Sequence, residues 1–136
     1  MTNPCRGRFA FLRSRPVVHC WPIARLGGEQ KIALVEFRRQ GKEALASLVL
    51  MDEDRTIFAD YTAEFRGAGQ DLWRADDGGV LSPEGFEVVC ALQRPNGFAL
   101  GISWGGAEGQ SLALWTSDGN SWFTQVISDY WYQAPV

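Results

Sequence analysis

Short alternating apolar segments, separated by turn residues, constrain this chain more than any other feature. Segments rich in Val, Ile, Phe and Trp are interrupted by phrases such as RQGK, DEDR, RPNG and SDGN. Such punctuation, at intervals of about ten to twelve residues, is typical of antiparallel strands. The pattern predicts an all-β antiparallel meander of about eight or nine strands, forming a barrel or a two-sheet sandwich with at most one short helix.

Alternation within single segments predicts which side chains enter the core. Residues 98–104, FALGISW, alternate large residues with small ones, so the large ones are expected to face the core. Residues 86–93, FEVVCALQ, alternate in the same way, which predicts that Cys90 and Leu92 also face the core. Two prolines restrict residues 15–23, RPVVHCWPI, to an edge strand.

The phrase WTSDGNSWF, residues 115–123, contains an Asp-Gly pair that supplies the backbone freedom of a tight hairpin turn. Trp122 is therefore expected to begin the returning strand. The pattern Ser/Thr-x-Asp-Gly-x-x-Trp resembles a phrase found in hairpins of sialidase-like propellers and sugar-binding sandwiches. A propeller would repeat it in every blade, whereas it occurs once here. We interpret it as a structural turn.

Length and charge predict one domain with an uneven charge distribution. The chain has 136 residues, 46% hydrophobic and 21% charged, which suits a single core. Residues 1–28 contain arginines and no acidic residue, yet the whole chain has a net charge of -3. We expect a single β domain over residues 1–136, with the basic segment 1–28 packed on an acidic body. An acidic surface repels phosphates, so nucleic acid is not an expected partner.

Metal, cofactor and membrane signals are missing from the sequence. Cys5, Cys20 and Cys90 form no CxxC motif and no cluster with histidine, so no metal site is predicted. No glycine-rich phosphate loop occurs, and no cofactor is predicted. The longest apolar run, LASLVLM, is too short to span a membrane. We expect a cytoplasmic protein with Cys20 and Cys90 reduced and buried, one disulfide being the alternative.

A few residues are candidates for chemistry. His19 is the single histidine, and Cys20 beside it must point to the opposite face of a strand. The two cannot act together as base and nucleophile, which leaves Cys5 or Cys90 as the alternative thiol partner. The favoured interpretation of His19 is a structural or partly exposed histidine. Glu36 shares a predicted strand face with apolar residues, where desolvation would suit it to acid-base chemistry. His19, Glu36 and Trp104 are the candidates for a pocket, and no residue is assigned as catalytic.

Surplus aromatic residues and an acidic surface favour a non-catalytic protein that binds a macromolecule, of the inhibitor, immunity or adaptor type. A protein partner is predicted at the aromatic tail and the acidic turns, namely Tyr130, Trp131, Tyr132, Asp52, Glu53, Asp54, Asp76 and Asp77. The alternative is a β-barrel with an apolar interior that binds a small apolar molecule. An enzyme that uses a buried carboxylate is a third hypothesis, and homo-oligomerisation stays open.

Overall fold

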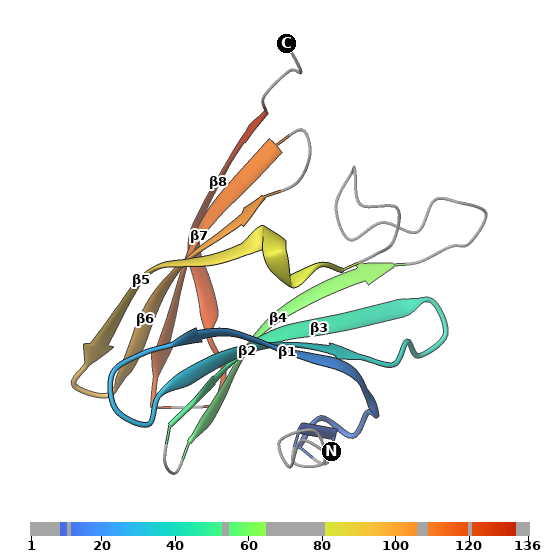
Figure 1. The fold of residues 1–136 in the computed structure, drawn as a ribbon, viewed down its shortest axis with the longest axis horizontal. Helices are drawn as coiled ribbons and strands as arrows, with labels where there is room; N and C mark the ends of the chain where they lie inside the picture. Colours follow the sequence, from blue (N-terminus) through green and yellow to red (C-terminus); the bar gives the residue numbers. More distant parts are fainter. Residues whose placement is uncertain are drawn as a thin grey trace.

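The computed structural model describes residues 9–10, 12–52, 55–64, 81–105, 109–119 and 121–132, with the backbone alone at residues 64 and 130–132. Strands in these residues form two antiparallel sheets of four (Figure 1). The first sheet has the order β1 (Val17–Arg25), β2 (Lys31–Phe37), β3 (Glu43–Met51) and β4 (Thr56–Glu64). The second has the order β5 (Phe86–Arg94), β6 (Gly97–Gly105), β7 (Gly109–Asp118) and β8 (Thr124–Tyr132). One turn of 3-10 helix, η1 (Pro83–Gly85), precedes β5.

The predicted antiparallel all-β meander is confirmed, because every strand within a sheet pairs with the next strand in sequence. Of the two predicted architectures, the sandwich fits and the closed barrel is wrong. The hydrogen-bonded ladders end at β4 in one sheet and resume at β5 in the other, so the described strands do not close on themselves. The edge position predicted for the proline-containing segment is also confirmed, since β1 borders the first sheet.

The main core lies between the two sheets. Its fully buried side chains come from alternate positions of the strands on both sides, and include Leu34, Leu48, Leu50, Phe98, Leu100 and Ile102. The alternation predicted for residues 98–104 is therefore confirmed. Each such side chain stabilises the fold by about 1.5–3 kcal/mol relative to exposure, so this layer carries much of the folding free energy.

The first sheet is buried on its outer face as well. There Val35, Phe37, Leu45, Val49 and Phe58 form a second apolar cluster. The described residues before β1, which we call the N-terminal arm, cover this cluster and insert Phe9, whose exposure is 0%. Because both faces are covered, β3 is buried along almost its whole length.

A β-bulge in β5 overturns part of the predicted alternation. Phe86 and Val88 pack on the core, but the register shifts between Val88 and Cys90. The additional residue turns Cys90 and Leu92 to the outer face, where both are exposed. The predictions that these two residues face the core and that Cys90 is buried are therefore wrong. Cys20 is only partly buried, and among the described residues neither Cys20 nor Cys90 forms a disulfide.

The link between β7 and β8 is wider than the tight hairpin that the sequence predicts. Gly119, with φ +82°, supplies the turn, but β8 begins at Thr124 rather than at Trp122. Trp122 instead forms a parallel bridge with Phe58 of β4. The Phe58 N–H donates to the Ser121 carbonyl at 3.0 Å, and the Phe123 N–H donates to the Phe58 carbonyl at 2.8 Å. This short segment joins the two sheets along one edge.

Candidate functional site

The outer face of the second sheet carries a continuous set of exposed apolar side chains, which we call the open face. It consists of exposed Val89, Cys90, Leu92, Leu112, Val126 and Ile127, together with the partly buried Leu114, contributed by β5, β7 and β8. Leu92 is 63% exposed, Ile127 62% and Val89 57%. Single exposed apolar residues are ordinary on a protein surface, whereas a contiguous apolar patch marks an interaction site.

Strand register makes the open face continuous. Cys90, Gly101, Leu114 and Ile127 pair in succession across the four strands, so they form one row perpendicular to them. The central strand β6 contributes only small residues to this face, because its large alternate residues point into the core. The Cys90 thiol lies over Gly101, where an added Cβ would stand 2.7 Å from the sulfur. The row from Cys90 to Ile127 is therefore apolar, while Ser103 and exposed Asp129 pair with Leu112 on either side in the next row.

Charged residues lie at the ends of the open face. Arg94, at the end of β5, forms an ion pair with Asp118 at the end of β7, the nitrogen and oxygen being 3.1 Å apart. Glu87 is exposed near the other end of β5. An apolar centre with a polar rim is the general anatomy of a protein-protein interface.

A second cluster lies under the N-terminal arm, where Arg13 contacts Asp60 of β4. Arg13 Nη1 donates to Asp60 Oδ1 at 2.7 Å, and Arg13 Nη2 donates to Asp60 Oδ2 at 2.6 Å. The hydroxyl of buried Ser47 donates to Asp60 Oδ1 at 2.5 Å. The rings of Phe58 and Trp122 flank the guanidinium. We call Asp60, Ser47, Phe58 and Trp122 the Arg13 site.

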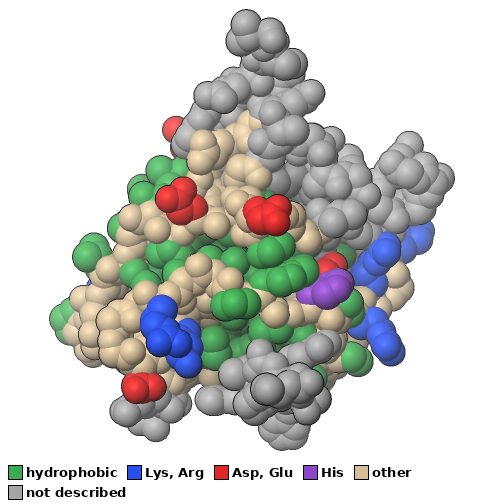
Figure 2. All heavy atoms as spheres, viewed as in Figure 1, with side chains coloured by type: hydrophobic (Ala, Val, Ile, Leu, Met, Phe, Trp, Pro, Cys, Tyr) green, Lys and Arg blue, Asp and Glu red, His purple; other side chains and the backbone are tan. Residues whose placement is uncertain are grey.

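His19 and Glu36, both predicted as pocket residues, lie together at the edge of the first sheet. Nδ1 of His19 is 2.8 Å from Oε1 of Glu36, and the imidazole stacks on Trp21 with ring centroids 4.8 Å apart. Figure 2 views this edge of the molecule, with the histidine in purple at the surface. A carboxylate in this position orients an imidazole. In the part of the chain that the structure describes, no three His, Cys, Asp or Glu side chains gather to hold a metal.

Trp104, the third predicted pocket residue, belongs to an aromatic cluster inside the sandwich. It stacks on Phe86 at 4.7 Å, and Tyr61 contacts both of these rings and Trp115 edge-on. Burial raises the pKa of the Tyr61 phenol well above its usual value, and the indole of Trp115 weakly opposes this shift. The buried Nε1 of Trp115 nevertheless makes no hydrogen bond of ordinary geometry. These rings fill the interior where a ligand chamber would have to lie.

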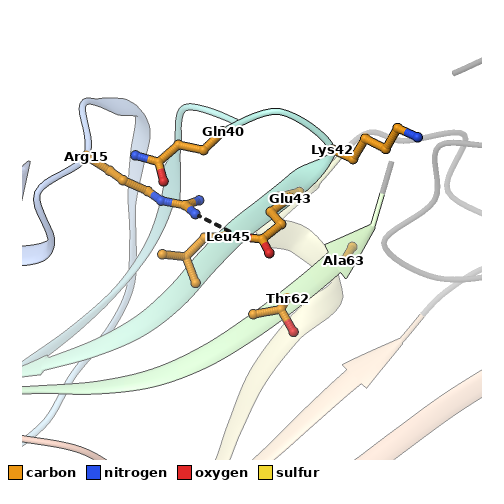
Figure 3. Close-up of a pocket in the computed structure, with 8 residues that line it drawn as sticks. Arg15, Gln40, Lys42, Glu43, Leu45, Thr62 and Ala63 are labelled. Atoms are coloured by element: carbon orange, nitrogen blue, oxygen red, sulfur yellow. Dashed lines mark ion pairs between the residues drawn. The ribbon is translucent and has the colours of Figure 1, made fainter. Parts of the chain in front are cut away.

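Described residues line two clefts outside the second sheet. The larger, of about 830 Å³, lies at the ends of β3 and β4 (Figure 3). Arg15 reaches into it towards Glu43, with Nη2 3.7 Å from Oε2, while Lys42 points away. The smaller, of about 680 Å³, is lined by residues of β1, β2 and the end of β3, from Cys20 to Asp52.

Comparison with protein families, curated proteins and solved structures finds no match for this chain. No helix among the described residues is long and apolar enough to cross a membrane. A function is therefore inferred from the chain's own surfaces.

The predicted acidic and aromatic partner surface is only partly visible. Asp52 is described, and its Oδ2 pairs with Arg55 at 3.3 Å. Four of the predicted acidic residues lie outside the described residues, namely Glu53, Asp54, Asp76 and Asp77. Tyr130, Trp131 and Tyr132 lie in β8, where only their backbone is described. Sequence reasoning missed the open face, because the bulge that exposes Cys90 and Leu92 leaves no mark in the apolar alternation.

Proposed function

We propose that this protein is a small, acidic, non-catalytic binding protein that engages a protein partner through the open face. The supporting observation is the contrast between its two outer sheet faces. The N-terminal arm covers the outer face of the first sheet, whereas the open face leaves Leu92 and Ile127 more than half exposed. Exposure of so many apolar side chains is unfavourable for a free protein, and a partner that buries them gains about 25 cal/mol for each Å² of apolar area.

The shape and charge of the open face indicate the chemistry of the partner. An apolar sheet face is complementary to another flat apolar surface rather than to a protruding side chain or a small polar ligand. The Arg94 charge is balanced by Asp118, while Glu87 near the other end of β5 is exposed. With a net charge of -3 for the whole chain, a partner with basic residues around its apolar patch is favoured.

The small-molecule alternative has weaker support. Aromatic and aliphatic side chains occupy the space between the sheets, so a ligand would have to use one of the outer clefts. The cleft beside Arg15 is the larger of the two and carries the guanidinium of that residue, which would suit an anion. An anionic small molecule bound there is the competing outcome of the experiment below.

Co-purification with matched variants tests the proposal. The wild-type chain, Leu92→Gln with Ile127→Gln, and the control Leu12→Gln would each be used to capture partners from the native host. Leu12 is also an exposed leucine, but it lies in the N-terminal arm, away from the open face. We expect the wild type and the control to retain a protein that the double variant loses.

Binding of that purified partner would then be measured by calorimetry. We expect the double variant to bind at least about ten-fold more weakly, since central anchors contribute 1 kcal/mol or more each. Circular dichroism would show that the variant is folded. Equal binding by the double variant would disprove the proposal, and an anionic small molecule in the purified wild type, without a protein partner, would favour the alternative.

A further inference from the structure

The Arg13 site recognises a guanidinium group by its shape as well as by its charge. Both terminal nitrogens of Arg13 donate to Asp60, one to each carboxylate oxygen, at 2.7 and 2.6 Å. This two-point contact matches the planar fork of a guanidinium, and an ammonium group cannot reproduce it. The geometry is that of a binding site for an arginine side chain.

The acceptor belongs to the sheet and does not depend on the arm. Ser47 and Asp60 face each other across β3 and β4. The Ser47 side chain is fully buried and donates its hydroxyl to Asp60 Oδ1, which orients the carboxylate. A carboxylate oriented in this way binds a guanidinium with little loss of conformational entropy.

Aromatic rings complete the site. The Cζ atom of Arg13 lies 4.5 Å from the centroid of Trp122 and 4.8 Å from that of Phe58. The two rings are held by the backbone bridge between β4 and the segment that leads into β8. Cations over aromatic faces are attracted by the ring quadrupole, most strongly over tryptophan. Every wall of the site therefore comes from the folded sandwich, and only its occupant comes from the arm.

Two side chains of the arm, Phe9 and Arg13, contact Phe58 on the outer face of the first sheet. Residues 9, 10, 12 and 13 have helical backbone, which puts Phe9 and Arg13 one turn apart on the same side. Phe9 is buried with its ring edge-on to Phe58, the centroids being 6.2 Å apart. Leu12 is exposed, whereas the Arg15 side chain is 11% exposed and its Nη2 lies 3.7 Å from the exposed carboxylate of Glu43.

The geometry points to a second binding site, in which the outer face of the first sheet takes a helical turn that carries an aromatic residue and an arginine four positions later. The chain's own arm is the occupant in this structure, and an arginine-bearing segment of a partner protein competes with it for Asp60, Phe58 and Trp122. This site is separate from the open face, so it stands or fails independently of the function proposed above.

Rescue with guanidinium ion tests whether the site exists apart from the arm. Arg13→Ala in the full chain vacates the site, and Arg15→Ala removes the neighbouring arginine as a matched control. We expect Arg13→Ala to lower the melting temperature by about 5 °C or more. Millimolar guanidinium should then restore stability saturably in Arg13→Ala, but not in Arg15→Ala or the wild type. Rescue that is absent, or equal in all three proteins, would overturn the inference.

A peptide tests the trans ligand directly. The probe is a fluorescein-labelled peptide of residues 7–16, compared with the same peptide carrying Lys or Ala in place of Arg13. We expect the arginine peptide to bind Arg13→Ala at least about ten-fold more tightly than the wild type, because the arm occupies the wild-type site. The Lys and Ala peptides should bind weakly. If Arg13→Ala does not fold, Arg13→Gln, which keeps the aliphatic stem, is used in its place. Equal binding of the Arg, Lys and Ala peptides would refute the site.

Discussion

Phe58 in the first sheet and Trp122 beyond the end of β7 form a parallel bridge that connects the two halves of the sandwich. The same two residues supply the aromatic walls around Arg13. One short contact thus joins the edges of the sheets and builds a guanidinium site under the N-terminal arm. Neither sheet could form this site alone, because β3 and β4 supply the acid and the hydroxyl while the segment after β7 supplies the indole.

The bridge leads to a prediction about coupling between Arg13 and Trp122. Trp122 is 47% exposed, so Trp122→Ala leaves no large cavity. We expect this variant to lower the free energy of unfolding by about 1 kcal/mol, because the cation-π contact with Arg13 is lost. A double-mutant cycle with Arg13→Ala, followed by urea unfolding, should give a coupling free energy of about 0.5–2 kcal/mol. Trp122→Phe, which keeps an aromatic face, should retain part of it. If the change in free energy of unfolding in the double variant equals the sum of the changes in the two single variants, the two side chains do not interact.

Close backbone approach at the start of β6 gives a second prediction. A Cβ on Gly97 would lie 1.9 Å from the Ser117 carbonyl oxygen, and a backbone atom paired in the sheet cannot move away cheaply. Gly97→Ala should therefore lower the free energy of unfolding by about 2–4 kcal/mol. Gly27 has no atom within 4 Å of an added Cβ, so Gly27→Ala should change it by less than about 1 kcal/mol. Equal effects in urea denaturation would contradict this explanation.

Apolar alternation predicts the strands well because each strand of the sandwich has to bury one face. The large residues of β6 follow the pattern without interruption. The pattern fails where a bulge intervenes, as at Val88 and Cys90, since one extra residue reverses every later side chain. It also assigned Trp122 to a strand of the second sheet, whereas the edge of β4 provides a competing hydrogen-bond partner.

The sites were harder to predict than the strands, because they depend on contacts between distant parts of the chain. The sequence groups His19 and Glu36 only as pocket candidates, whereas the register of β1 with β2 shows that they pair with each other. The pairing of Arg13 with Asp60 has no local signal, since the two residues are 47 positions apart. The open face could not be predicted from the apolar alternation, because the alternation assigned Cys90 and Leu92 to the core.

The thiols provide a test of the bulge and of the open face together. Cys90 is exposed beside Gly101, whereas Cys20 is partly buried against the second apolar cluster. In the folded protein we expect N-ethylmaleimide to modify Cys90 roughly ten-fold faster than Cys20, as followed by peptide mapping. The modified Cys90 should also weaken binding of a partner to the open face. Faster labelling of Cys20 would place the bulge elsewhere in β5.

Alkaline stability should report the burial of Tyr61. Burial raises the pKa of its phenol in the folded protein above the value of about 10 expected in the unfolded chain. Above pH 10 the unfolded chain therefore loses this proton while the folded protein keeps it. Deprotonation then favours the unfolded state, and this residue lowers the free energy of unfolding by up to about 1.4 kcal/mol per pH unit. Below about pH 9 the phenol is protonated in both states, so the contribution of Tyr61 to the free energy of unfolding does not change with pH.

Tyr61→Phe removes the titration but keeps the ring in its cluster with Phe86, Trp104 and Trp115. The difference in free energy of unfolding between wild type and variant should be constant from pH 7 to 9 and shift in favour of the variant above pH 10, as measured by urea unfolding. Phe86→Leu, in the same cluster, changes packing without changing a titratable group, so its difference from wild type should not vary with pH. A Tyr61→Phe difference that stays flat to pH 11 would mean that water reaches the phenol in the folded protein, and the aromatic cluster would then be open at that end of the sandwich.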